Sequence, residues 1–178
     1  INSQSGKGGV AYLLEKDHGL SMPRRLQIEF SQVIQKIADE SGKEISPSDI
    51  WDNFQETYLN SSGNYEFIEH HINSSSNKDG TQSDEITIGL KHNTDIVSII
   101  GRGNGPIDAM IDAIKKSFNL EIKISDYHQH AISSGSDAKA VAYSELVLGN
   151  KSVWGVGMHQ NTVIAGLLSV ISGLNRLS

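Results

Sequence analysis

The sequence predicts an α+β protein in which an N-terminal helical subdomain is followed by a domain of two β-β-β-α units. Three observations support this prediction. Apolar residues recur at helical spacing up to about residue 60, apolar and polar residues alternate after residue 65, and an order of strands, glycines and helix then occurs twice. The predicted boundaries are 1–60 for the helical subdomain and 65–178 for the second domain, with units at about 65–118 and 120–178.

Two amphipathic helices are predicted in the first subdomain. Pro23 suits the first turn of a helix, and an apolar stripe at three- and four-residue steps continues from there to Gly42. The stripe consists of Leu26, Phe30, Val33, Ile34 and Ile37. Ser46 and Pro47 are typical of an N-cap followed by an early proline, which predicts a second helix. The apolar face of this second helix contains Ile50, Phe54 and Tyr58.

The first β-β-β-α unit follows the polar run 60–64, which offers nothing to pack and is expected to separate the two domains. We predict a strand over 65–73 and then a polar loop over 74–83. Apolar residues alternate with polar ones over 86–90, and 96–100 is an apolar run. Because residues that can turn lie between these two segments, a hairpin is predicted.

Both units are predicted to end in glycines and a helix that covers one face of the sheet. In the first unit, the glycines of 101–106 lead into a helical stripe over 107–118. The strands expected in the second unit cover 120–132, 138–148 and 151–158. A helix over 163–174 follows them, and the glycines of 155–157 lie at the strand end as those of 101–103 do in the first unit.

Composition and charge limit the classes of function. Hydrophobic residues at 37% and charged residues at 20% are typical of a folded globular chain. The formal charge of −6 at pH 7 disfavours nucleic acid and an anionic membrane as partners. The chain has no cysteine, no run of apolar residues long enough for a membrane span and no signal-peptide pattern at its start. The expected compartment is therefore the cytoplasm.

Motifs for phosphate, metal and nucleophilic chemistry are incomplete. The glycines of 6–9 lack the spacing of a phosphate-binding loop, and those of 101–105 lack that of a dinucleotide fingerprint. His70-His71 and the pair His128 and His130 have no suitably spaced further ligands. No serine lies in a nucleophile elbow. We therefore predict no catalytic residue and no bound metal or cofactor in this chain.

Two features leave a binding role open. The glycines of 101–105 form either a structural turn or a place where bare backbone at a helix start meets a small anion such as a carboxylate. Small side chains also recur along the strands of the second unit, at Ala131, Ala138, Ala140 and Ala142. The space they leave beside Tyr127 is either filled by a packed helix or kept as an apolar pocket.

Several strings in the sequence, taken together, resemble the 2-isopropylmalate synthase family. In the second domain they are GRGNGPIDA at 101–109, DYHQHA at 126–131, GSDA at 135–138, AY at 142–143, WGVG at 154–157 and NR at 175–176. In the first they are NSQSGKGGVA at 2–11, PRRLQIEF at 23–30 and GK at 42–43. The likeness covers essentially the whole chain and indicates the longer, actinobacterial-type form of the synthase.

This resemblance implies a regulatory role. The family condenses acetyl-CoA with 2-oxoisovalerate on a metal-dependent (β/α)8 barrel, the committed step of leucine synthesis, and leucine inhibits it through paired C-terminal domains. The present chain would correspond to the helical subdomain after the barrel and the regulatory domain. It would then be a homodimeric L-leucine sensor that acts on its own catalytic barrel and is inactive by itself. The divalent metal would belong to that barrel.

The resemblance also implies an effector pocket. Carried over by motif, its residues are Gly103, Gly105, Ile107, Asp108, Ile124, Tyr127, Ala131 and Ala138. Two positions depart from the family pattern, because Gln129 stands where Glu is common and Met158-His159 replaces Ile-Asp. Either departure could alter local charge or the coupling of the effector.

Three other functions remain open from the sequence. Citramalate synthase has a similar regulatory domain that senses isoleucine, although the PRRLQIEF string favours the isopropylmalate enzyme. A dimerisation module without a ligand and a hydrolase that uses histidine and serine are the others. Titration with leucine would separate a sensor from a purely structural module, and a barrel-coding sequence upstream of Ile1 would exclude the hydrolase.

Overall fold

Helices and two antiparallel sheets alternate in layers in the computed structural model, which describes residues 7–60, 63–133 and 138–178. The helices are α1 (Lys7–His18), α2 (Arg24–Ser41), α3 (Pro47–Phe54) with its π-helical continuation η1 (Gln55–Leu59), α4 (Pro106–Phe118) and α5 (Thr162–Leu177). The strands are β1 (Tyr65–Ser76), β2 (Gln82–His92), β3 (Asp95–Gly103), β4 (Ile122–Ala131), β5 (Ala140–Leu148) and β6 (Lys151–His159). This is the predicted α+β order, with two β-β-β-α units after the helices.

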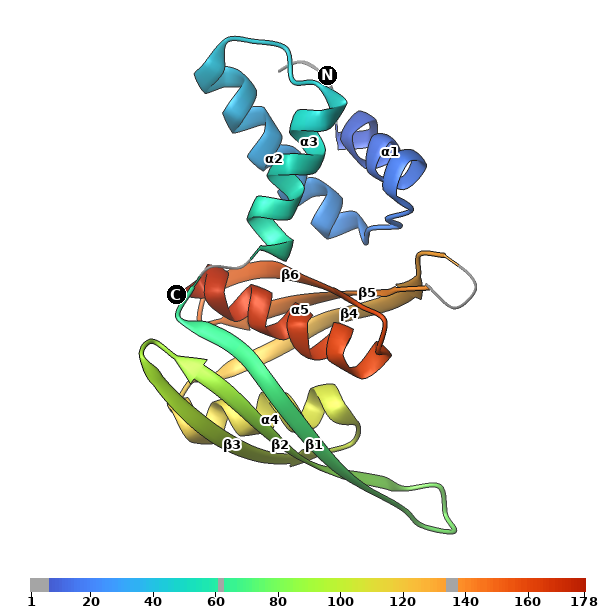
Figure 1. Cartoon of the computed structure of the whole chain (residues 1–178), viewed down its shortest axis with the longest axis vertical. Helices are drawn as coiled ribbons and strands as arrows, with labels where there is room; N and C mark the ends of the chain where they lie inside the picture. The colour runs from blue at the N-terminus through green and yellow to red at the C-terminus, as the bar shows by residue number, and fades with distance from the viewer. Residues whose placement is uncertain (1–6, 61–62, 134–137) are drawn as a thin grey trace.

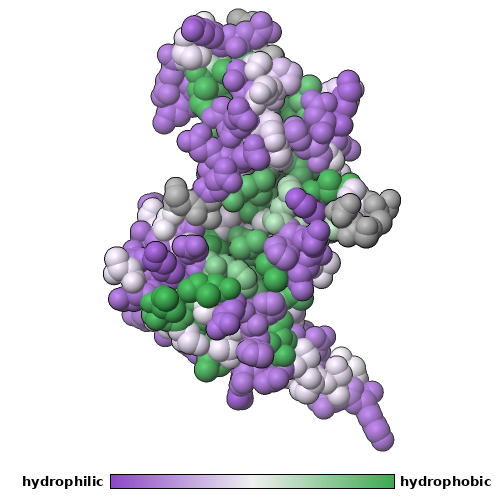
Figure 2. All heavy atoms as spheres, in the orientation of Figure 1, coloured by the Kyte–Doolittle hydropathy of each residue, from purple (hydrophilic) through white to green (hydrophobic). Residues whose placement is uncertain are grey.

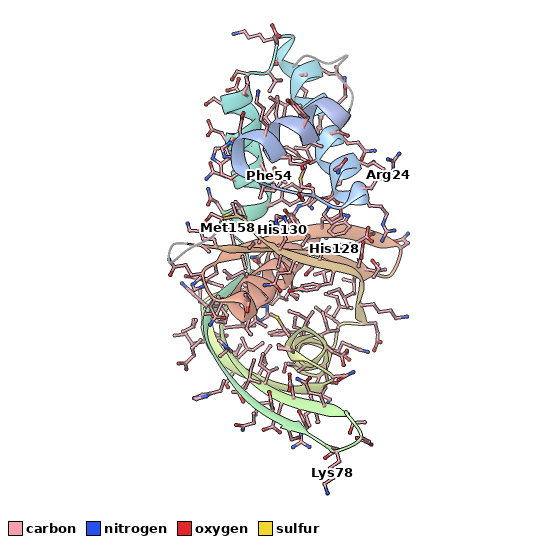
Figure 3. The ribbon with its side chains drawn as sticks, turned by 90° about the vertical axis from the view of Figure 1, so that its right-hand side faces the viewer. Arg24, Phe54, Lys78, His128, His130 and Met158 are labelled. Carbon is pink, nitrogen blue, oxygen red and sulfur yellow. The ribbon has the colours of Figure 1, made fainter. Side chains whose placement is uncertain are left out.

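The order of the layers is visible in two views. In Figure 1, helices α1 to α3 lie above the sheet β4-β5-β6, α5 and α4 lie below it, and the sheet β1-β2-β3 closes the lower end. Figure 3 shows the lower sheet curving around α4, with Lys78 at the tip of the β1-β2 hairpin. Both helices of the second domain therefore lie between the two sheets, where α4 contacts α5.

Capping interactions confirm the predicted C-terminus of α2 and the predicted N-terminus of α3. Gly42 ends α2 in the left-handed conformation, with φ 66°, and its N–H donates to the carbonyl of Ala38. At α3, the Ser46 hydroxyl accepts from the Asp49 N–H, and the Asp49 carboxylate accepts from the Ser46 N–H, both at 3.1 Å. Phe54 extends from this helix into the core that α2 lines.

The sequence patterns did not single out α1 as a separate helix. Val10 and Leu14 are its buried apolar residues, and α1 packs against α2 and α3 through them. Gly8 and Gly9 at its start have low helix propensity, so the local signal is weak. Tertiary packing, which includes His18 stacked on Trp51 with ring centroids 3.7 Å apart, supports the helix instead.

The polar loop predicted over 74–83 is wrong in its extent. Strand β1 continues to Ser76 and β2 begins at Gln82, with these two residues paired across the hairpin. The turn is limited to 77–81, where the side chain of Asn77 donates to the Thr81 hydroxyl at 2.8 Å. A backbone ladder needs no apolar side chains, so a serine-rich segment can extend a hairpin that apolar residues anchor elsewhere.

Glycines at the end of β3 and β6 allow the helices to approach the sheets closely. A Cβ added at Gly101 would clash with the backbone of α4 at Ala109, and one added at Gly157 would clash with the backbone of α5 at Ala165. The two glycines occupy equivalent places in the two units. The duplication predicted from the sequence therefore corresponds to the same close helix-sheet packing in both halves.

The central strand β5 of the sheet β4-β5-β6 is buried on both faces. Val141 and Tyr143 point into the core formed with the helical subdomain, whereas Ala142 and Ser144 point toward α5. Figure 2 shows hydrophobic residues at the surface of the lower half of the molecule, around the sheets, while the upper half is mostly hydrophilic. In the described ranges, no helix is long and apolar enough to cross a membrane.

Candidate functional site

The turn before α4 is held by its own backbone and by one carboxylate. The Asp108 carboxylate accepts from the Asn104 N–H at 2.9 Å, and a Cβ added at Gly103 would lie 2.6 Å from that carboxylate. Gly105 has φ 112°, a region that favours glycine, and an added Cβ there would meet nothing within 4 Å. Gly103 thus faces α4, while Gly105 faces open space at the start of the helix.

Side chains from the two units meet at a glycine of α5. Ile107 comes from α4 and Tyr127 from β4. A Cβ added at Gly166 would lie 2.7 Å from the Tyr127 hydroxyl and 2.8 Å from Cδ1 of Ile107. We call this place, defined by Ile107, Tyr127 and Gly166, the seam. Gly166 is not among the pocket residues predicted from the sequence, although a glycine inside an apolar helical stripe is a signal of close packing.

The hydroxyl of Tyr127 is part of a short chain of hydrogen bonds. It donates to Oε1 of Gln129 at 3.0 Å, and Nε2 of Gln129 donates to the carbonyl of Thr162 at 2.9 Å. Burial raises the pKa of Tyr127, so its hydroxyl stays protonated and can donate. An amide is required at residue 129 for this arrangement, because a glutamate could accept from the tyrosine but could not donate to the carbonyl.

A surface cavity of about 410 Å³ lies next to Gln129. Its lining residues are Gln129, His130, Ala131, Ala138, Lys139, Ala140, Gln160 and Thr162. This volume is within the range of about 300 to 1,000 Å³ that is usual for small-molecule sites. Residues 134–137, which include most of the GSDA string, lie outside the described residues.

The structure places the eight predicted pocket residues in separate groups. Ile107 and Tyr127 meet at the seam, Ala131 and Ala138 line the cavity, and Gln129 connects the two places. Gly103, Gly105 and Asp108 form the turn before α4, as described above. Ile124 is half-buried and packs on the apolar core that both units share. Their role in binding a ligand stays a prediction.

The histidines of the second unit have separate partners. His130 lies 2.8 Å from the Tyr143 hydroxyl, and Nε2 of His128 lies 2.9 Å from the Asp126 carboxylate. Figure 3 places His130 at the level where the sheet meets the helical subdomain. Within the described part of the chain, no group of three or more His, Asp or Glu side chains could hold a metal ion.

Residues 44–178 match the model of the LeuA allosteric (dimerisation) domain. The chain belongs to this family. It is 44% identical to the 2-isopropylmalate synthase of Rhodospirillum rubrum, over all of this chain and 32% of that protein. It is also 44% identical to the enzyme of Mycobacterium leprae, over 99% of this chain and 28% of that protein, and 45% identical to that of Azoarcus sp., over all of this chain and 30% of that protein. The chain thus spans about a third or less of these relatives, and it matches their C-terminal part.

The match to the LeuA allosteric domain begins before α3. This helix and η1 are attached to the domain through Tyr58, whose carbonyl accepts from the Ser172 hydroxyl of α5 at 2.7 Å. The same hydroxyl accepts from the Val156 N–H of β6 at 3.1 Å. A buried serine therefore connects η1, α5 and β6.

Proposed function

We propose that this chain is the leucine-sensing regulatory portion of a 2-isopropylmalate synthase and mediates feedback inhibition of that enzyme. Membership in the LeuA allosteric family and the names of the relatives support this proposal. The observation that carries it is the convergence of Ile107 and Tyr127 at Gly166, beside a cavity lined by Ala131 and Ala138. Both units contribute to this place, so a ligand bound there would report on their relative position.

The chemistry of the seam and cavity suits a branched aliphatic amino acid. Small alanine side chains leave room for an apolar group, and each buried methylene contributes about 0.8 kcal/mol. The backbone at Gly105 faces open space at the start of α4, where the helix dipole favours a carboxylate. The ligand would thus be recognised at both of its ends.

Inhibition would follow from a shift between arrangements of paired domains. If leucine binds one arrangement more tightly than another, it shifts the population toward the arrangement that it binds more tightly. The difference between the two affinities sets the size of the shift. We propose that the chain acts as a homodimer in the cytoplasm. Condensation of acetyl-CoA with 2-oxoisovalerate, and the divalent metal it uses, would belong to the rest of the protein, whose active site responds to the arrangement of the regulatory domains.

Titration calorimetry of the 178-residue chain tests the proposal. We expect saturable binding of leucine and at least tenfold weaker binding of alanine, because alanine lacks the branched side chain that the alanine-lined cavity would bury. Equal heats for leucine, alanine and lysine would contradict a leucine sensor. Tighter binding of isoleucine than of leucine would instead indicate a regulator of the citramalate synthase type.

A further inference from the structure

Neighbouring residues at the end of β4 belong to opposite faces of its sheet. Gln129 and Ala131 line the cavity and are paired with the alanines of β5 that pack toward α5. His130, which also borders the cavity, is paired with Val141, whose side chain points into the core formed with the helical subdomain. This short piece of strand therefore has the cavity on one face and the helical subdomain on the other.

The imidazole of His130 contacts the helical subdomain directly (Figure 3). The Ser21 N–H, between α1 and α2, donates to Nε2 of His130 at 3.3 Å. The Tyr143 hydroxyl lies 2.8 Å from the same nitrogen. Burial, and to a smaller extent the charge of Glu15, raises the pKa of this hydroxyl, so it stays protonated and can donate. Nε2 of His130 is thus placed to accept in both contacts.

The partners of the two ring nitrogens determine which of them carries the hydrogen. Nδ1 of His130 lies 3.0 Å from the carbonyl oxygen of Ala131, which can only accept, so Nδ1 must donate. Nε2 faces the Ser21 N–H, which can only donate, so this nitrogen needs a free lone pair. The ring is therefore a neutral imidazole with its hydrogen on Nδ1. A hydrogen on Nε2 would point at the Ser21 N–H and would remove that hydrogen bond.

Both ends of this contact are attached to parts of the protein that resist independent movement. The carbonyl that orients the ring belongs to Ala131, which lines the cavity. Ser21 lies between Leu20 and Met22, and both of these side chains are buried in the core of the helical subdomain. Close-packed cores transmit displacements, so a ligand that shifts Ala131 would act through the ring and Ser21 on that core.

We propose that His130 is a positioning residue that couples the cavity to the helical subdomain through a neutral imidazole with its hydrogen on Nδ1. The inference rests on the leucine binding proposed above and names the route by which a ligand in the cavity would act on the helices. In the relatives, the part that this chain matches is C-terminal. The segment corresponding to the helical subdomain is therefore the part of that match that is covalently nearest to the rest of each relative.

Nuclear magnetic resonance of the isotope-labelled chain at neutral pH, with and without saturating L-leucine, tests this coupling. The nitrogen shifts of the His130 ring report which nitrogen carries the hydrogen, and the exchange rate of the Ser21 N–H reports its hydrogen bond. His130→Phe removes both ring nitrogens, whereas His130→Gln keeps an oxygen that can accept from the Ser21 N–H. His128→Phe is the matched control on the same strand, because the imidazole of His128 pairs with Asp126 of β4.

We expect the hydrogen on Nδ1 in the wild type, and we expect leucine to slow exchange of the Ser21 N–H by at least about threefold. His128→Phe and His130→Gln should keep this effect of leucine, and His130→Phe should lose it. Leucine is added to saturation for each variant, so that a change in affinity alone does not alter the comparison. Circular dichroism checks that the variants are folded, and if His130→Phe is not, the two wild-type measurements decide.

The results also separate this inference from the function on which it rests. If calorimetry shows leucine binding but the His130 hydrogen is on Nε2, or leucine does not slow exchange at Ser21, the coupling is overturned and the sensor is not. Retention of the full effect in folded His130→Phe would overturn the coupling as well. A wild type that does not bind leucine would overturn the proposed function, and this inference with it.

Discussion

Arg25 of α2 and Glu145 of β5 form an ion pair that joins the helical subdomain to the sheet of the second unit. Two guanidinium nitrogens of Arg25 donate to the carboxylate. Nε of Arg25 lies 3.0 Å from Oε1 of Glu145, and its Nη2 lies 2.5 Å from the same oxygen. The Ser125 hydroxyl of β4 also donates to this carboxylate at 2.8 Å. Because Ser125 and Tyr127 lie on the same strand, Glu145 joins α2 to the strand that carries Tyr127 at the seam.

We expect the free energy of unfolding to fall at acid pH because of Glu145. Desolvation raises the pKa of this carboxyl, but hydrogen bonds from Arg25 and Ser125 and the charge of Arg25 outweigh it, so the net pKa is lowered. A lowered pKa in the folded state gives stability that is present above the unfolded value and is lost as pH falls through the folded value. In Arg25→Gln, the free energy of unfolding should fall less steeply as the pH is lowered below about 5. Urea denaturation at several pH values in this range would measure the difference.

The control for this prediction is Arg24→Gln, which removes the same charge from an exposed neighbouring residue. Its pH dependence should follow that of the wild type. If the pH dependence of the free energy of unfolding becomes equally shallow in both variants, the cause is the change in net charge and not the loss of the ion pair with Glu145.

Ala138→Leu should abolish most leucine binding and leave the dimer intact. Ala138 is half-buried and lines the cavity, so three extra carbons would occupy the space that the ligand needs. If Ala138 were packed in a core, the same change would instead cost about 1 to 3 kcal/mol of stability. Melting curves of both proteins, with and without saturating leucine, distinguish these results. A variant that melts as the wild type does and gains full stabilisation from leucine would show that Ala138 lies outside the pocket.

Gly166→Ala should weaken leucine binding by about tenfold, or about 1.4 kcal/mol. The new methyl would displace the Tyr127 hydroxyl and the end of Ile107 from the seam, since both lie within 2.8 Å of the added Cβ. Gly173→Ala is the matched control. It crowds Leu146 at 2.7 Å, at a residue of the same helix outside the seam. Calorimetry should show unchanged leucine affinity in the control, and equal losses in both variants would contradict a specific role for the seam.

Gly101→Ala and Gly157→Ala should each destabilise the fold by about 1 to 3 kcal/mol, because a Cβ at either residue meets the backbone of a helix. The two effects should be similar, since the glycines have equivalent places in the two units. Gly8→Ala, where an added Cβ meets nothing within 4 Å, should have no such cost. Urea denaturation measures all three. Wild-type stability in either strand variant would contradict the close approach of helix and sheet.

Features that depend on neighbouring residues could be predicted from the sequence. The caps at Gly42 and Ser46, the alternation along β2 and the two β-β-β-α units are all found in the structure. Each depends on helix or strand periodicity, or on the preference of a residue for one backbone conformation. The length of the loop predicted over 74–83 was overestimated, because the prediction used only the polarity of the segment. The pairing of Ser76 with Gln82 is a contact between two strands, which polarity does not indicate.

The candidate site depended on the tertiary structure. The resemblance predicted eight pocket residues, but it did not include Gly166. Only the structure shows that Gly166 of α5 lies against both Ile107 and Tyr127, which are far apart in the sequence. The hydrogen bond of Gln129 to the Thr162 carbonyl likewise joins β4 to the start of α5. Composition and periodicity therefore determined which elements form and how often they repeat. Which side chains meet between the elements was decided by packing, because the volume that one element leaves open depends on the surface of another.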